Sequence, residues 1–285
     1  MPRIRGVVQG LGFLALLSSS FVAPPARGED VPAAGSLVIC GGGGLPDSVR
    51  GRFVELAGGP RSRIVVVPTA SQDADAQGPE LDEFLEPWRK RGAGSVKLLH
   101  TRSRDKADEA EFAAQLDEAD GVWFSGGDQS RITEAYLGTA TEAALRRVLS
   151  RGGVIGGTSA GAAIMTKVMI TGGSEKASLG SGFGFLPGVV VDQHALRRSR
   201  LNRLLGVLAE HPELAAGVAI DEGTALIVDL AKNQFQIAGE SYVVVCRPSK
   251  DGPAGAPPRF DVFHEGQRGE LESWSPMARE ARGDR

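Results

Sequence analysis

Short, mostly apolar runs recur along the first half of the chain and alternate with helical patterns. The runs predicted to be buried strands are residues 36–40, 63–68, 95–100, 121–124 and 152–157. Between them, apolar residues return every three or four positions, which predicts helices at 48–57, 80–91, 109–116 and 141–150. Strands that are buried on both faces and separated by helices favour right-handed crossovers. The pattern therefore predicts an α/β domain with a mostly parallel sheet.

The second half continues this pattern and then changes. Strands are predicted at 189–191, 216–220 and 225–228, and a closing antiparallel portion at 235–237 and 241–246. The glycine- and serine-rich segment 172–184 is expected to be a loop over the functional site. Residues 160–167 are expected to be helical, as is a basic segment with four arginines after residue 196. The charged stretch 265–285 is expected to be a mostly disordered tail.

The first residues have the pattern of an export signal. A basic start at 1–5 precedes an apolar run at 6–23, and Ala26-Arg27-Gly28 offers the small-x-small pattern of a signal-peptidase site. A membrane anchor is the alternative, which Gln9 and the serines at 18–20 disfavour. The expected organisation is a signal at 1–28, a linker at 29–35, one domain at 36–264 and the tail. The mature protein is expected to be secreted or periplasmic, with no stable membrane anchor after cleavage.

Composition narrows the class of protein. A chain of 285 residues with 41% apolar and 24% charged residues is an ordinary soluble globule. A net charge of −3 offers no basic face for nucleic acid. The two cysteines, Cys40 and Cys246, both lie in apolar strand patterns, which favours buried free thiols. A disulfide between them remains the alternative in an oxidising compartment.

The candidate chemistry starts at the end of the strand 152–157. Ser159 follows it in Gly157-Thr-Ser-Ala-Gly161, and a serine between small residues on a sharp strand-to-helix turn has the geometry of a nucleophile. Polar residues also end other strands, at 128–129, 192–194 and 221–222. Because ligands bind beyond the carboxyl ends of parallel strands, these groups are expected to cluster at one edge of the sheet.

A serine nucleophile needs a base, and the chain has four histidines. His211 and His264 have the sequence setting of surface groups. His100 ends a strand and competes, but no carboxylate-rich strand end adjoins it in sequence. His194 directly follows Asp192 and Gln193 at a strand end and is the preferred base.

Three carboxylates compete to orient that histidine: Asp192, Asp221 and Glu222. Spacing alone favours Glu222 over Asp221 only slightly. The order serine, histidine, acid differs from the serine, acid, histidine order of α/β-hydrolases and implies another fold. The N–H groups of Ala160 and Gly127 are the candidates for an oxyanion hole, with an ordinary strand-to-helix turn as the equal alternative at Gly127.

The glycines at 41–44 follow the first strand. They lack the spacing of a dinucleotide fingerprint and the Lys-Ser/Thr ending of a phosphate loop. A tight turn that requires positive φ is therefore expected.

Four ordered motifs stand out between about Ser36 and Cys246: Phe124-Ser-Gly-Gly-Asp-Gln129, Gly156-Gly-Thr-Ser-Ala-Gly-Ala162, Leu186-Pro-Gly-Val-Val-Val-Asp-Gln-His194 with the arginines after it, and Ile220-Asp-Glu-Gly-Thr224. They resemble the motifs of cyanophycinases, serine exopeptidases related to aspartyl dipeptidase (peptidase E) in peptidase family S51. The resemblance implies a three-layer α/β/α sandwich that is flavodoxin-like, similar to class I glutamine amidotransferases, and often a homodimer.

The resemblance also implies roles for residues. Ser159 would be the nucleophile, His194 the general base and then acid, and Glu222 the orienting carboxylate. The positions that match the family's substrate pocket are Gln129, Asp192, Gln193, Arg198, Arg200 and Arg203. No metal or cofactor is implied. This chain departs from the family at the glycines 41–44, where acidic and lysine residues are usual, and at Ala195, where an aromatic residue is usual.

The expected function is a secreted serine peptidase that hydrolyses cyanophycin or related β-aspartyl-arginine peptides through an acyl-enzyme. An aspartyl or isoaspartyl dipeptidase is one alternative, and a catalytically idle binding protein of the same fold is another. An amidotransferase proper is disfavoured because the turn carries Ser159 and not cysteine.

Overall fold

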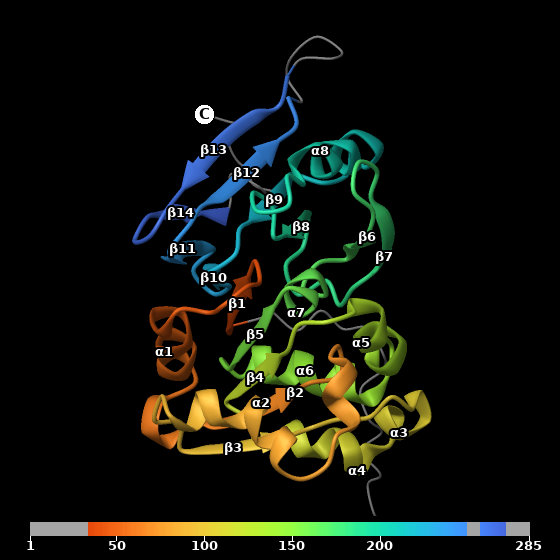
Figure 1. Cartoon of the computed structure of the whole chain (residues 1–285), viewed down its shortest axis with the longest axis vertical. Coiled ribbons are helices and arrows are strands. Elements are labelled where there is room, and N and C mark those ends of the chain that lie inside the picture. Colours follow the sequence, from red (N-terminus) through yellow and green to blue (C-terminus); the bar gives the residue numbers. More distant parts are fainter. Residues whose placement is uncertain (1–33, 250–256, 272–285) are drawn as a thin grey trace, which may run out of the picture. The chain divides into compact units, whose positions relative to one another are not determined.

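A computed structural model describes residues 34–249 and 257–271 (Figure 1). Its helices are α1 (Asp47–Leu56), α2 (Pro79–Arg89), α3 (Arg104–Asp108), α4 (Ala110–Ala113), α5 (Gln129–Tyr136), α6 (Ala140–Ser150), α7 (Ala160–Ala163) and α8 (Leu201–Glu210). Short 3₁₀ helices lie at η1 (Gly59–Arg61), η2 (Gln72–Asp75) and η3 (Ala114–Leu116). The predicted helix 109–116 is therefore α4 with η3, and α3 precedes it.

The strands form three sheets. The first seven are β1 (Ser36–Cys40), β2 (Arg63–Val67), β3 (Ser95–Leu98), β4 (Gly121–Phe124), β5 (Val154–Thr158), β6 (Val168–Gly172) and β7 (Ser178–Ser181). The others are β8 (Val189–Gln193), β9 (Ala216–Ile220), β10 (Thr224–Asp229), β11 (Gln234–Gly239), β12 (Val243–Arg247), β13 (Arg259–Phe263) and β14 (Arg268–Glu270).

The large sheet has eight strands in the order β14-β11-β10-β1-β5-β4-β2-β3. Its five strands from β1 to β3 in that order pair in parallel, and β10, β11 and β14 add antiparallel pairs. The strand before Ser159, β5, lies between β1 and β4. The carboxyl ends of the parallel strands therefore surround Ser159, as expected for this fold class.

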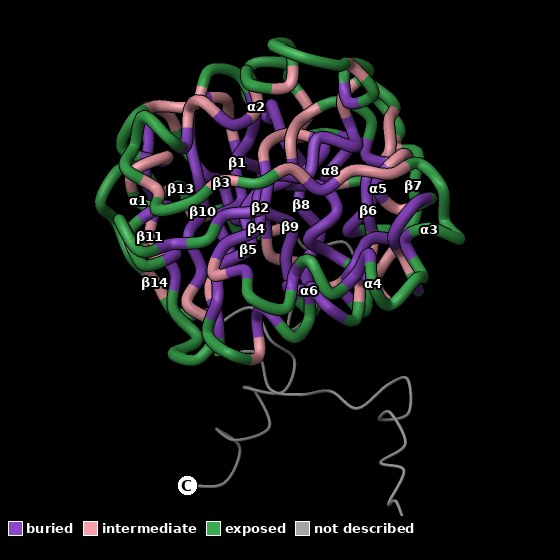
Figure 2. The backbone as a smooth tube through the Cα atoms, turned by 90° about the horizontal axis from the view of Figure 1, so that it is seen from below, coloured by how far each residue is buried: buried purple, intermediate pink, exposed green. Residues whose placement is uncertain are grey.

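Side-chain alternation along the strands separates two layers of helices. On β1, Leu37 and Ile39 pack with α4, α5 and α6, whereas Val38 and Cys40 pack with α1 and α2. Figure 2 shows these strands as a buried interior. The predicted three-layer α/β/α sandwich with a mostly parallel central sheet is confirmed.

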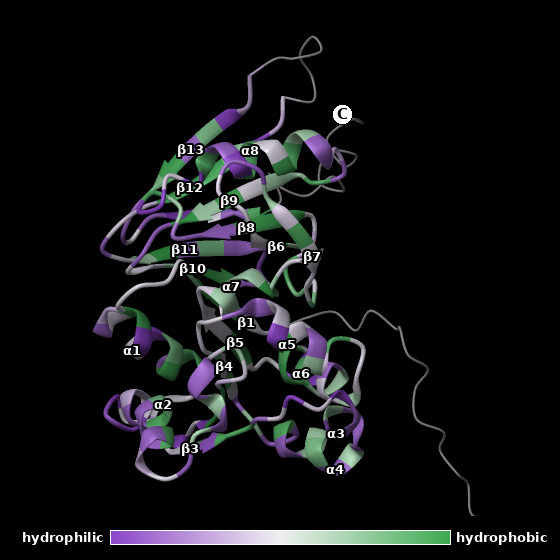
Figure 3. Ribbon diagram, turned by 45° about the vertical axis from the view of Figure 1, so that its right-hand side comes forward, coloured by the Kyte–Doolittle hydropathy of each residue, from purple (hydrophilic) through white to green (hydrophobic). Residues whose placement is uncertain are grey.

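A second sheet was not predicted. It has four strands in the order β13-β12-β9-β8, and it carries the chain segments that end in His194 and Glu222. One face packs on α8 through Val190 and Leu204, and the other joins the main core through Val191 and Val218. In Figure 3 these strands are largely hydrophobic. The expectation that serine, histidine and acid end strands of one sheet is therefore wrong, because continuous apolar strands look alike in either sheet.

Three segments after Ser159 also differ from expectation. The helix predicted at 160–167 stops at Ala163, and β6 follows. The segment predicted as a loop at 172–184 contains β7, which pairs with β6 in a two-stranded hairpin. The helix α8 begins at Leu201, so Arg197, Arg198 and Arg200 precede its first turn. Short strands rich in serine and glycine have too weak an apolar pattern to be recognised.

Three further predictions concern the two ends of the chain and its cysteines. Arg268–Glu270 pairs with β11, so the fold extends beyond 264 to Leu271, and the tail was predicted to begin too early. The predicted signal at 1–28 lies outside the described residues. Within the described ranges, no helix is long and apolar enough to cross a membrane. Cys40 and Cys246 are both free and buried, as expected.

Candidate active site

Ser159 lies on the sharp turn between β5 and α7. Its backbone has φ 53° and ψ −108°, a conformation rare for residues other than glycine. Gly157 and Gly161 make the turn possible, because a side chain at Gly157 would collide with the backbone of Gly161. Such local strain is typical of a residue held in place for function.

His194 reaches Ser159 from the second sheet. The His194 Nε2 atom lies 2.8 Å from Ser159 Oγ. His194 also has φ 53°, and its backbone N–H donates to the carbonyl of Gly41, 2.7 Å away. The Ser159 N–H donates to the carbonyl of Cys40 at 3.0 Å. The end of β1 therefore joins the two strand ends that carry the hydroxyl and the imidazole.

Glu222 completes the chain of side chains. Its Oε1 atom lies 2.6 Å from His194 Nδ1, with the imidazole 8% and the carboxylate side chain 32% exposed. The carboxylate therefore favours the tautomer with the proton on Nδ1, which leaves Nε2 free to accept the hydroxyl proton of Ser159.

The other two candidate carboxylates have different partners. Asp221 Oδ1 accepts hydrogen bonds from the N–H groups of Leu196 and Arg197, and its Oδ2 accepts from Ser241 Oγ at 2.9 Å. Asp192 forms a buried pair with Arg203, described below. Of the three, Glu222 is the one on the imidazole, a distinction that sequence spacing could not make.

Burial lowers the pKa of His194 below its ordinary value. The hydrogen bond with Glu222 acts in the opposite direction, and the positive charges of Arg198 and Arg200 lower the pKa further. The net direction is downward, so the imidazole is neutral at neutral pH. A neutral imidazole is the form that can accept a proton.

The glycines after β1 form the support of this constellation, a role that the sequence did not reveal. Gly42 and Gly43 have φ 109° and 69°, as expected for a tight turn. A Cβ atom on Gly42 would lie 2.2 Å from His194 Cε1, and one on Gly43 would lie 2.9 Å from Glu222 Oε2. The run of glycines is the sequence feature that could have indicated this role, because glycines allow the side chains of His194 and Glu222 to pack directly on the backbone.

The two candidate oxyanion donors come from the turns that follow β5 and β4. Ala160 is the first residue of α7, where a helix leaves its N–H groups without intrahelical partners. Gly127 has φ 138° and lies in the turn after β4. Its neighbour Gly126 is close to Ser159, since a Cβ atom there would lie 3.5 Å from Ser159 Cβ.

The residues at the family's pocket positions fall into two groups. Gln129 donates through Nε2 to the carbonyls of Ile170 and Thr171 at 2.8 and 2.9 Å, and Arg203 donates to the carbonyl of Gly173. These two side chains therefore hold the β6–β7 hairpin. Arg203 also binds Asp192 through two hydrogen bonds of 2.7 and 2.5 Å, and the pair is fully buried.

The second group lies after the strand end. Arg200 Nη1 donates to Gln193 Oε1 at 2.6 Å and is half-buried. Arg198 is exposed, and its charge acts on His194. Of the three arginines at pocket positions, Arg198 and Arg200 are therefore more accessible to solvent than the buried Arg203.

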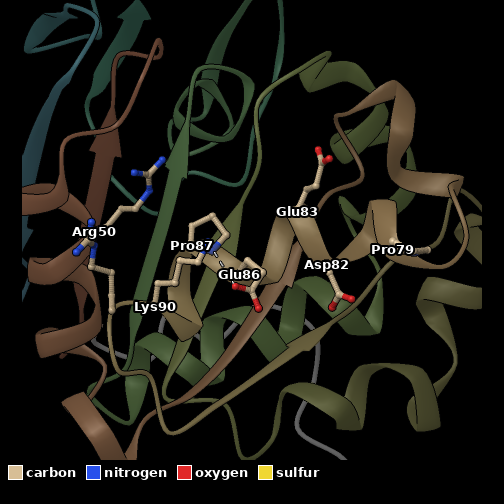
Figure 4. A pocket seen from close by; sticks show the side chains of 8 residues that line it. Arg50, Pro79, Asp82, Glu83, Glu86, Pro87 and Lys90 are labelled. Atoms are coloured by element: carbon tan, nitrogen blue, oxygen red, sulfur yellow. Dashed lines mark ion pairs between the residues drawn. The ribbon is translucent and has the colours of Figure 1, made fainter.

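A well-defined hollow lies elsewhere on the surface. It has a volume of about 560 Å³ and lies between α1 and α2, with charged side chains such as Arg50, Glu83 and Lys90 around it (Figure 4). Ser159, His194 and Glu222 are not among the residues that line it. Within the described residues, no cluster of histidine, cysteine and acidic side chains suited to a metal ion is found.

Comparison with known proteins identifies the family of this chain. The model of peptidase family S51 matches residues 37–235. The cyanophycinase of Synechococcus elongatus is 36% identical over 219 residues, a match that covers 72% of this chain and 66% of that protein. The cyanophycinase of Geminocystis herdmanii is 33% identical over 217 residues, covering 71% of this chain and 78% of that protein.

A solved structure supports the fold independently. A peptidase from an acI-B1 actinobacterium superposes with a TM-score of 0.66 at 20% identity, covering 84% of this chain and 98% of that one. The matched family region includes Ser159, His194 and Glu222. The chain belongs to peptidase family S51 and is similar to its cyanophycinases.

Proposed function

We propose that the protein is a serine-type exopeptidase that hydrolyses cyanophycin or related β-aspartyl-arginine peptides through an acyl-enzyme. The observation that carries this proposal is the continuous hydrogen-bonded series Ser159–His194–Glu222, with distances of 2.8 and 2.6 Å. Serine, imidazole and carboxylate in this order are the parts of a nucleophilic triad.

The first chemical step is attack by Ser159 Oγ on the scissile carbonyl carbon. As the new C–O bond forms, His194 Nε2 accepts the hydroxyl proton, and Glu222 stabilises the imidazolium through Nδ1–H. The N–H groups of Ala160 and Gly127 are proposed to donate to the oxyanion. The site is ready for this step because the His194 pKa is lowered and the base starts neutral.

The second half of the reaction uses the same groups. His194 Nε2–H donates its proton to the leaving amine as the C–N bond breaks, which leaves an ester on Ser159. A water molecule then loses a proton to His194 and attacks the ester, and Ser159 departs with that proton. Ser159 and His194 end the cycle in the protonation states in which they began.

The substrate class follows from the relatives and from the charges at the site. Two relatives reported above, 36% and 33% identical to this chain, are cyanophycinases. Arg198 and Arg200 offer guanidinium groups that can bind a substrate carboxylate bidentately, whereas Arg203 and Asp192 are occupied by one another. We propose that four other residues at pocket positions support the surface formed by Arg198 and Arg200. They are Gln129, Gln193 and the buried pair of Asp192 and Arg203. We also propose that the protein acts outside the cytoplasm, in a periplasm or the medium, and that it can form a homodimer.

The decisive experiment replaces the nucleophile. Purified Ser159→Ala is expected to lose about 10⁴- to 10⁶-fold in kcat on cyanophycin and β-Asp-Arg, because no other group can form the ester. Ser150→Ala, at the last residue of α6, is the matched control and should retain full activity, because its hydroxyl bonds the carbonyl of Arg147 on the surface. Products are identified by mass spectrometry.

The outcomes separate the alternatives. Hydrolysis of dipeptides without release from the polymer would identify a dipeptidase. Full activity of Ser159→Ala would exclude the mechanism. No hydrolysis by the wild type, together with no labelling of Ser159 by a serine-directed electrophile, would identify a binding protein.

A further inference from the structure

The turn that carries Gly127 rests on the backbone of a neighbouring strand end. The Asp128 N–H donates to the carbonyl of Ala70 at 3.0 Å. A Cβ atom on Gly127 would lie 2.1 Å from that same carbonyl oxygen, so the two backbones are in direct contact. The position of the Gly127 N–H therefore depends on where the Ala70 carbonyl lies.

One arginine fixes the backbone on both sides of Ala70. Arg102 Nη1 donates to the carbonyl of Thr69 at 3.0 Å, and Arg102 Nη2 donates to the carbonyl of Ser71 at 2.9 Å. Its Nε donates to Asp75 Oδ2 at 2.5 Å. A planar guanidinium that binds three acceptors at once holds its partners in a fixed geometry, which lysine cannot reproduce.

A second set of side chains holds the arginine's partners. Asp75 Oδ1 lies 2.9 Å from His100 Nε2, and His100 Nδ1 lies 2.8 Å from Thr69 Oγ1. Thr69 Oγ1 lies 2.7 Å from the hydroxyl of Tyr136, which accepts from the Thr101 N–H. With a neutral His100 protonated on Nε2, each hydroxyl donates one hydrogen bond and accepts one.

This series resembles a second triad but has no exposed nucleophile. The Thr69 side chain is fully buried, and its hydroxyl lies between His100 and Tyr136. Only the outer part of the series meets solvent, in a hollow of about 360 Å³ lined by Gln72, Asp75, Arg102 and Arg131. The arrangement is therefore suited to hold backbone and not to attack a substrate.

We propose that Arg102, together with Asp75, His100 and Thr69, forms a clip that positions the Gly127 N–H for the oxyanion. We call these four residues the Arg102 clip. This inference rests on the proposed function, because the oxyanion arises only in that reaction. Arg102 is a positioning residue, since it touches the backbone beside Gly127 and not the reacting atoms.

The test compares Arg102→Gln with Arg102→Lys, and uses Arg89→Gln as the matched control. Arg89 also pairs with a carboxylate, Asp82, but on the exposed surface of α2. Four quantities are measured: kcat and KM on β-Asp-Arg, the affinity for an aspartyl aldehyde that forms a tetrahedral adduct with serine, and the hydrogen exchange of the amides at 125–128.

The clip predicts a specific pattern of losses. Arg102→Gln should lower kcat by about 10- to 100-fold, because displacing an oxyanion donor weakens transition-state binding, and should change KM little. Affinity for the aldehyde should fall by a similar factor, and exchange of the Asp128 amide should accelerate. Arg102→Lys should be intermediate, and Arg89→Gln should match the wild type.

The opposite pattern overturns the proposal. If the wild type is active and Arg102→Gln keeps its kcat, its aldehyde affinity and slow exchange at Asp128, Arg102 does not position this turn. If the wild type is inactive, the proposed function fails separately, and amide exchange still decides whether Arg102 holds the turn. If Arg102→Gln does not fold, Asp75→Asn and Arg102→Lys supply the same comparison.

Discussion

Burial lowers the pKa of His194. The hydrogen bond with Glu222 acts in the opposite direction, and the positive charge of Arg198 lowers the pKa further. The reaction needs the neutral imidazole, so activity is lost as the pH falls through this pKa. Arg198→Gln removes a positive charge that opposes protonation, and the pKa of His194 should rise. The acid limb of the kcat/KM profile should then move to higher pH.

The neighbour Arg197 provides the control for this prediction. It is also exposed, but its charge is not among those that shift the His194 pKa. Arg197→Gln should leave the acid limb in place. An unshifted limb in Arg198→Gln would show that its charge does not reach the imidazole.

The buried pair of Asp192 and Arg203 gives a prediction about stability. Both side chains are at most 1% exposed, and Arg203 also donates to Gly173 in the β6–β7 hairpin. Asp192→Ala leaves a guanidinium in the core without its counter-ion, which should cost about 3–5 kcal/mol in the free energy of unfolding. Urea denaturation measures the loss.

An exposed pair supplies the comparison. Asp82 forms an ion pair with Arg89 at 2.8 Å, and both side chains are well exposed, so Asp82→Ala should lower the free energy of unfolding far less than Asp192→Ala does. Equal losses in the two variants would mean that the buried pair is not an important contact for folding.

At the scale of elements, the glycine turn after β1 brings the two sheets together at the site. Gly42→Ala would place a methyl group 2.2 Å from His194 Cε1 at a backbone φ of 109°. We expect the ring to move away from Ser159 and kcat to fall about 100-fold, with a smaller loss of stability of about 1–3 kcal/mol.

Gly44 offers a matched control within the same turn. A Cβ atom there meets nothing within 4 Å, and its φ lies outside the strained positive range. Gly44→Ala should therefore retain activity. If both variants were equally active, the close packing of Gly42 on the imidazole would not matter for catalysis.

The elements show what the sequence could predict. Continuous apolar strands and helical spacing were sufficient for β1 to β5 and for most of the helices between them, although α3 was missed. The strand-end residues predicted that Ser159 and His194 lie together with a carboxylate, but they left the choice of carboxylate open. The assignment of strands to sheets was not predictable, because β8 and β9 have the same apolar pattern as β4 and β5. The role of Arg102 was also hidden, since its partners Thr69 and Asp75 are about thirty residues away in sequence.

At the scale of the whole domain, the end of the described chain joins the two sheets. β13 is the edge strand of the four-stranded sheet, and β14 is the edge strand of the eight-stranded one. Phe263 packs edge-on against Phe235 of β11, with ring centroids 5.1 Å apart, and Gly269 lies directly over the same ring. The Leu271 N–H donates to the Asn233 carbonyl at 2.7 Å. The segment 259–271, which we call the C-terminal arm, therefore spans the two sheets that supply the serine and the histidine.

Truncation tests whether the arm stabilises that arrangement. A chain that ends at His264 loses the β11–β14 pairing and the burial of Leu271, which should lower the free energy of unfolding by about 2–4 kcal/mol. A chain that ends at Leu271 keeps both and should unfold at a higher urea concentration than the shorter chain. The shorter chain should also lose kcat, since Ser159 and His194 come from different sheets. Identical unfolding midpoints and kcat values for the two truncated chains would show that the sheets hold together without the arm.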